Sequence, residues 1–138
     1  MKVEVIIERS ADGLFAAYAE ECIGNHGLAG YGDSVEEALE DFNVSVSEMN
    51  EMRLEEGLPP VEVEISPKYD IESFFDRFPY LNVSRVAERA GINPSLMRQY
   101  ASGSTKAGQK QYDKIRKAVK VIANELSAAT SFKLPNIH

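Results

Sequence analysis

Residues 82–103 read NVSRVAERAGINPSLMRQYASG and predict two short helices that are joined by a tight turn. Asn82 is a favourable N-cap for the first helix, and Gly91 can take the left-handed backbone that ends it. Asn93 is the expected N-cap of the second helix, and Pro94 stands at its first helical position, where the missing N–H costs nothing. Two capped helices around a glycine turn are the pattern of a helix-turn-helix.

The apolar positions and the charge of this region support the same interpretation. Ala87 is the small residue that a close helix crossing needs, and Met97 is an apolar residue placed to hold the second helix against the first. Residues 81–120 carry nine basic and two acidic side chains, a balance that suits a polyanion. The alternative is a helical hairpin that serves only packing.

We expect the second helix to be the one that reads DNA, with Leu96, Met97 and Tyr100 facing inward. Arg98 can donate a bidentate pair to guanine, and Gln99 can make the matching pair with adenine. The predicted DNA-binding residues, which are exposed on this helix or follow it in a loop near the phosphates, are Asn93, Ser95, Arg98, Gln99, Ser102, Ser104, Thr105 and Lys106. The alternative is that Arg98 and Gln99 are merely solvated.

Residues 107–126 predict a third, single helix on which cationic side chains surround an apolar stripe. The stripe consists of Tyr112, Ile115, Val119, Ile122 and Leu126. The cationic side chains form a solvated face, or they contact phosphates beside the helix-turn-helix. We therefore place the DNA-binding domain at residues 81–130 and expect residues 131–138 to form a loose tail.

The first 66 residues show the alternation of a sheet instead. Four strands are predicted, over residues 3–8, 14–20, 28–32 and 61–65. A helix begins after Ser34, whose spacing to Glu37 is that of a capping box, and it ends at Gly57. The order β-β-β-α-β favours a sheet with one face covered by one helix, and the nearly all-apolar second strand is expected to be central.

The two halves of the chain carry opposite charge, although its 138 residues have a net charge of −7. Residues 1–66 contain 16 acidic and 3 basic side chains, and residues 67–138 contain 6 acidic and 12 basic ones. Residues 67–80 are assigned to a linker that holds a short helix over 71–78, with Asp70 as its N-cap. This division predicts two modules with different partners, and the alternative is two solvated surfaces.

The side chains that carry chemistry do not converge in the sequence. The longest apolar run, residues 14–19, has six residues, against the roughly 20 that span a bilayer. Cys22 and His26 are a lone pair in a loop, and the strand glutamates alternate outward: Glu4, Glu8, Glu62 and Glu64. We therefore expect a cytoplasmic protein that is not an enzyme, with no catalytic residues, no metal, no cofactor and no membrane contact.

Residues 1–66 resemble the HicB-type antitoxins of bacterial type II toxin–antitoxin modules. The resemblance rests on the strand LFAAYAE, on the segment YGDSVEEALEDF, and on Gly57 and Pro59 after it. The family's G-D-[ST]-x-E-E-A helix start corresponds here to Gly32, Asp33, Ser34, Val35, Glu36, Glu37 and Ala38. The fold that this implies is a partial ribonuclease-H-like domain that is catalytically inert. The basic half is similar to the helix-turn-helix domains of phage repressor and Cro proteins.

The resemblance implies an α+β chain with two tasks. The N-terminal domain would bind and block a HicA-type toxin that cleaves messenger RNA, and the all-α domain would bind operator double-stranded DNA and repress its own operon. A homodimer or a dimer of dimers is expected, because one recognition helix reads too few bases. The toxin-binding residues are not assigned by the sequence. The alternative is a stand-alone helix-turn-helix regulator whose N-terminal domain senses a ligand or dimerises.

Overall fold

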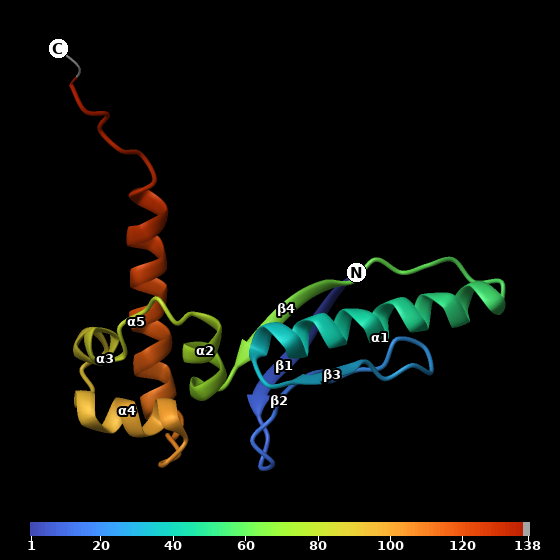
Figure 1. Ribbon diagram of the computed structural model, residues 1–138, viewed down its shortest axis with the longest axis horizontal. Coiled ribbons are helices and arrows are strands. Elements are labelled where there is room, and N and C mark those ends of the chain that lie inside the picture. Colours follow the sequence, from blue (N-terminus) through green and yellow to red (C-terminus); the bar gives the residue numbers. More distant parts are fainter. Residues whose placement is uncertain (137–138) are drawn as a thin grey trace. The chain divides into compact units, whose positions relative to one another are not determined.

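The computed structural model describes residues 1–136, and within them it shows an α+β fold with one mixed sheet of four strands and five helices (Figure 1). The chain forms two compact units, Met1–Pro79 and Tyr80–His138. The elements are, in order, β1 (Lys2–Arg9), β2 (Phe15–Ala19), β3 (Ala29–Gly32), α1 (Val35–Glu55), β4 (Glu64–Tyr69), α2 (Ile71–Arg77), α3 (Val83–Ala90), α4 (Pro94–Ser102) and α5 (Gln109–Ala128).

The sheet of the first unit has the strand order β3-β2-β1-β4, so β2 is internal as its apolar sequence predicts. Strands β1, β2 and β3 are paired antiparallel, whereas β4 lies parallel to β1. A parallel neighbour requires a crossover connection, which α1 supplies. Figure 1 shows α1 lying across one face of this sheet.

The core of the first unit lies between that face and α1. Val3, Val5 and Ile7 alternate onto the face and are buried, because side chains on a strand point to opposite faces in turn. On α1, Phe42 and Met49 are buried against them. The helix begins as predicted, since the N–H of Glu37 donates to the Ser34 hydroxyl over 3.1 Å.

The glycines of β3 let α1 come unusually close to the sheet. A Cβ atom at Gly30 would overlap the backbone nitrogen of Phe42 and the carbonyl oxygen of Ala38. A Cβ atom at Gly32 would likewise overlap the Glu37 side chain. Both glycines face α1. They allow the helix backbone to come close to the strand, and they do not form a turn.

The last strand lies later in the chain than the predicted 61–65. Val61 lies before the ladder, where the Asn50 side-chain amide accepts from the Val61 N–H at 2.9 Å and donates to its carbonyl at 3.0 Å. The ladder with β1 starts at Glu64, whose N–H donates to the Met1 carbonyl, and it continues through Pro67. Apolar alternation therefore begins before the backbone pairing does.

Helix α2 packs within the first unit, where residues 67–80 were expected to be a linker. Asp70 caps it as predicted, accepting from the Ser73 N–H at 2.8 Å. The Asp76 carboxylate accepts from the N–H of Val35 at 2.8 Å and thereby satisfies the first turn of α1. The rings of Phe74 in α2 and of Phe78, which follows the helix, also pack edge-on against Tyr69 of β4. The bond from Asp76 cannot be predicted from local sequence, because its partner Val35 lies 41 residues away.

The second unit is all-α, and its last element, α5, is a single helix that begins and ends two residues later than the predicted 107–126. Its apolar stripe is only partly buried: Ile115 is covered, but Tyr112 and Leu126 are 36% and 59% exposed, and Ala118 is buried in their place. The reason is length, since α3 has 8 residues and α5 has 20, so α3 covers less than half of α5. Residues 131–136 form no helix or strand, and the last two positions of the predicted tail lie outside the described residues.

We predict that Gly30→Ala destabilises the protein by about 1–3 kcal/mol, because the added methyl group meets helix backbone that cannot rotate away. The free energy of unfolding in urea measures this effect. Gly27→Ala is the matched control, since a Cβ atom there has nothing within 4 Å. Equal stability of the two variants would show that α1 does not press on β3.

We also predict that a fragment of residues 1–79 folds, whereas a fragment of residues 1–66 does not. The shorter fragment loses half of β4 and the Asp76 carboxylate that caps α1. Far-ultraviolet circular dichroism and urea unfolding of both fragments measure the difference. A cooperative transition of equal midpoint in the two fragments would assign α2 to a linker after all.

Candidate nucleic-acid interface

The turn between α3 and α4 has the geometry that the sequence predicts. Gly91 adopts φ +70°, a left-handed conformation that glycine takes without strain. The N–H of Ile92 donates to the Ala87 carbonyl at 2.9 Å and ends α3, while the Ile92 side chain is buried inside the turn. The Asn93 carboxamide oxygen accepts from the Ser95 N–H at 2.9 Å and caps α4.

A small apolar core holds the three helices of this unit together. Ala87 of α3 and Met97 of α4 are fully buried where the two helices meet. Tyr100 is also buried, and its hydroxyl accepts from the Gln111 side chain of α5 at 3.3 Å. Leu96, which was expected to face inward, is only half-buried. The packing fixes which side of α4 is turned to solvent.

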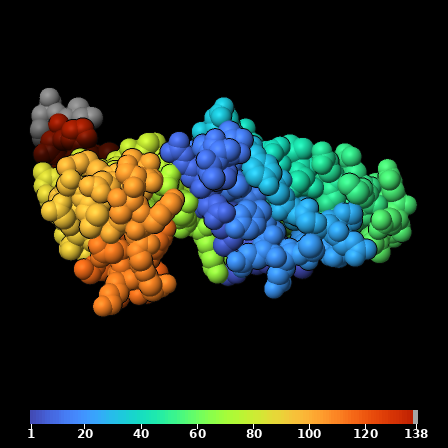
Figure 2. All heavy atoms as spheres, turned by 90° about the horizontal axis from the view of Figure 1, so that it is seen from below, coloured from blue at the N-terminus to red at the C-terminus, as the bar shows by residue number. Residues whose placement is uncertain are grey.

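The predicted DNA-binding residues lie on that outer side or just after it. Seven of them are exposed, namely Asn93, Ser95, Arg98, Gln99, Ser102, Ser104 and Lys106, and Thr105 is half-buried. Figure 2 shows α4 and the turn that follows it at the surface, in yellow and orange. Exposure is necessary for a DNA contact, and the contacts themselves stay a prediction.

Arg98 is oriented by a neighbour that the sequence did not single out. Its Nη1 atom donates to the Ser84 hydroxyl at 2.8 Å, which joins α4 to the first turn of α3. A guanidinium has five N–H donors, so this bond occupies only part of the fork. Holding a long side chain in one direction lowers the entropy that it loses on binding. Sequence patterns miss Ser84 because it lies on the other helix, 14 residues away.

The side chains of Gln99 and Asn93 form hydrogen bonds within the protein. The Thr105 hydroxyl donates to the Gln99 side-chain oxygen at 2.9 Å, and this is the oxygen that would accept from the adenine amino group. Asn93 likewise commits its oxygen to the helix cap. The oxygen of a side-chain amide has two lone pairs, so Gln99 can keep its bond from Thr105 while it accepts from adenine, and Arg98 can likewise keep its bond to Ser84.

Basic side chains also lie close together between α3 and α5. Arg89, Lys114 and Lys117 line an open groove of about 260 Å³, together with the small Ala90 and Ala118. Arg89 is bound to the carboxylate of Glu125 at 2.6 Å. The basic side chains of α5 thus form part of a groove wall, which no spacing in the sequence indicates.

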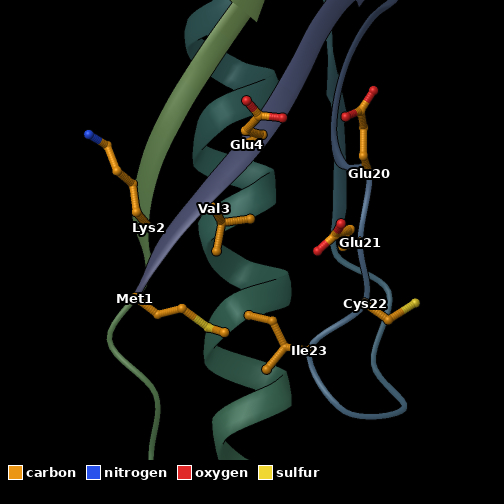
Figure 3. Close-up of a pocket in the computed structure, with 8 residues that line it drawn as sticks. All are labelled: Met1, Lys2, Val3, Glu4, Glu20, Glu21, Cys22 and Ile23. Atoms are coloured by element: carbon orange, nitrogen blue, oxygen red, sulfur yellow. The ribbon is translucent and has the colours of Figure 1, made fainter.

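The first unit holds acidic side chains without an assembled metal site. Within residues 1–136, no group of three or more His, Cys, Asp and Glu side chains is placed to hold an ion. A pocket of about 300 Å³ opens at the start of β1, where Figure 3 shows Glu4, Glu20 and Glu21 around the apolar Val3. Cys22 is exposed there, and its thiol points away from the other side chains (Figure 3).

Comparisons of the chain with protein-family models, with curated proteins and with solved structures each gave no match. No helix within residues 1–136 is long and apolar enough to cross a bilayer.

Proposed function

We propose that the protein is an antitoxin and repressor, whose first unit binds a basic HicA-type toxin and whose second unit binds operator DNA. The main support for this proposal is that the chain changes its charge at the boundary between the two compact units. Met1–Pro79 contains 5 basic and 19 acidic side chains, and Tyr80–His138 contains 10 basic and 3 acidic ones. The charge changes sign where one compact unit ends and the next begins, so each unit presents its own field.

The second unit supports DNA binding by its geometry and its charge. In this proposal α3 and α4 are a helix-turn-helix, and α4 enters the major groove with Ser95 and Arg98 toward the bases. Arg98 reads a guanine from the position in which Ser84 holds it. Two copies act together on two half-sites, as a homodimer or a dimer of dimers.

The first unit supports binding of a basic protein and offers no catalytic machinery in this proposal. Its net charge of −14 attracts a cationic partner and repels nucleic acid. The resemblance of residues 1–66 to HicB antitoxins supplies the kind of partner, and it implies that the sheet is a reduced ribonuclease-H-like fold. The protein would act in the cytoplasm, without metal or cofactor.

The alternative of a ligand-sensing regulator has one observation in its favour, the pocket of about 300 Å³ at the start of β1. That volume is at the lower end for small-molecule sites, and three carboxylates stand around it. The antitoxin proposal uses the charge of the whole unit, and we therefore prefer it.

We predict that Arg98→Ala weakens specific DNA binding by about 1–3 kcal/mol and relaxes the preference at one base pair. DNA selected from a random pool by the wild-type chain, followed by titration of that site and of unrelated DNA, measures both effects.

Lys106→Ala should weaken binding to all sequences alike and reduce the slope of affinity against salt concentration by about one. Lys133→Ala is the control for charge alone. Equal losses of specific and unspecific affinity in Arg98→Ala would refute base reading by this side chain.

We predict that the first unit binds the product of a small basic reading frame next to its own gene, with an association rate that falls as salt rises. Growth of cells that express this product with and without the full-length chain tests neutralisation, and stopped-flow mixing measures the rate. Failure to bind would remove the antitoxin half of the proposal and leave DNA binding untouched.

A further inference from the structure

The sheet of the first unit has a second face, which α1 does not cover. Strand register places four residues side by side across it, Lys68 with Ile6, Ile6 with Tyr18, and Tyr18 with Ala29. The next row consists of Glu8, Ala16 and Tyr31. We call these residues, apart from Lys68, which is paired with Glu4, the open-face patch. Ala16 is buried, and Ile6, Glu8, Tyr18 and Ala29 are half-buried. Tyr31 is 56% exposed, although a tyrosine ring is the kind of group that protein interfaces bury.

The chemistry of the open-face patch combines aromatic rings with a carboxylate. The Tyr18 hydroxyl donates to Glu8 Oε1 at 3.2 Å. Burial raises the pKa of the Tyr18 phenol, and the charges of Glu8 and Glu20 raise it further, so the phenol stays a neutral donor. Within residues 1–136 no cationic side chain forms a salt bridge with Glu8, whereas Glu4 on the same strand is paired with Lys68 at 3.2 Å.

Both edges of the sheet are interrupted, so they fit a partner strand poorly. The N–H of Tyr31 points outward from β3, where the Asp41 carboxylate of α1 accepts it at 2.9 Å. On β4 the N–H groups of Glu64 and Asp70 donate to the side of β1, so Pro67 stands at an outward position and interrupts the free edge. A partner that adds a strand finds no continuous ladder, which leaves the faces for recognition.

We propose that the open-face patch binds the basic partner protein by seating an arginine side chain on Tyr18 and Tyr31 beside Glu8. A guanidinium stacks on an aromatic face and donates to a carboxylate in the same plane, which an ammonium does less well. This inference rests on the proposed function, since it takes the partner to be a basic protein. A second copy of the unit fits worse, because it brings a net charge of −14 and its own Glu8 to the same surface.

The test maps the binding site of a synthetic probe on the full-length chain. The probe is an eight-residue peptide of alternating arginine and serine, titrated into ¹⁵N-labelled protein and compared with a lysine–serine peptide. We expect saturable chemical-shift changes at the open-face patch and weaker binding of the lysine peptide. Glu8→Gln and Tyr31→Ala should each lower the affinity for the arginine peptide about tenfold, and Tyr31→Phe should keep it.

Two variants outside the open-face patch are matched controls. Glu40→Gln removes one exposed carboxylate of α1, and Leu54→Ala shortens a side chain that is 71% exposed. If Glu40→Gln weakens peptide binding as much as Glu8→Gln, the attraction is unspecific and the inference is overturned. Urea unfolding shows whether each variant is folded, and Tyr31→Leu, which keeps a large apolar side chain without the aromatic ring, decides the role of the ring if Tyr31→Ala is unstable.

Two further results separate this inference from the proposed function. If Tyr31→Ala leaves peptide binding unchanged and instead converts an oligomer to a smaller species in light scattering, the open-face patch joins copies of this chain and the inference fails. If the wild-type chain ignores the neighbouring basic product but the peptide maps to the patch, the proposed function fails while the arginine site stands. If the product is bound and no patch variant affects that binding, only the inference fails.

Discussion

The contact of β3 with α1 is the constraint on which the first unit depends. A backbone-to-backbone approach of this kind is possible only where no Cβ atom intervenes, and Gly30 and Gly32 meet that condition. The helix then lies close enough to the sheet for the Phe42 side chain to be fully buried in the core. The same approach brings Asp41 to the outward N–H of β3 and closes that edge of the sheet. One pair of glycines thus decides both packing and edge protection.

A sheet that is covered by a single helix leaves its other face without a covering layer. Here that side combines charged residues with a small aromatic group, in keeping with antiparallel strands that face solvent. Asp41 accepts one outward N–H of β3, and Pro67 has none to offer on β4, so neither edge presents a continuous row of N–H donors. The fold therefore limits how the first unit can recognise a partner before any partner is known.

The boundary between the units is also the boundary between two electrostatic fields. Helix α2 belongs to the acidic unit, since Asp76 satisfies the N-terminus of α1 and Glu72 pairs with Arg9 at 3.5 Å. Its inclusion leaves the basic side chains concentrated in a unit of three helices. Opposite charges on separate compact units allow one chain to attract a basic protein and a polyanion without one surface cancelling the other.

The sequence by itself determined the elements whose signals are local. The asparagine caps, the turn at Gly91 and the alternation of β1 depend on neighbours within a few residues, so their patterns are legible in the chain. The outward side of α4 follows from its apolar period in the same way. The charge division is likewise a property of composition, although its structural boundary is not.

Only the tertiary structure decided the features that join distant segments. The side-chain amide of Asn50 bonds both backbone groups of Val61 ahead of β4, and the place of α2 depends on Asp76 reaching Val35. The orientation of Arg98 depends on Ser84 of another helix. In each case a polar side chain satisfies a group that lies far away in the sequence, and a hydrogen bond of that kind leaves no periodic trace because it is set by folding geometry alone.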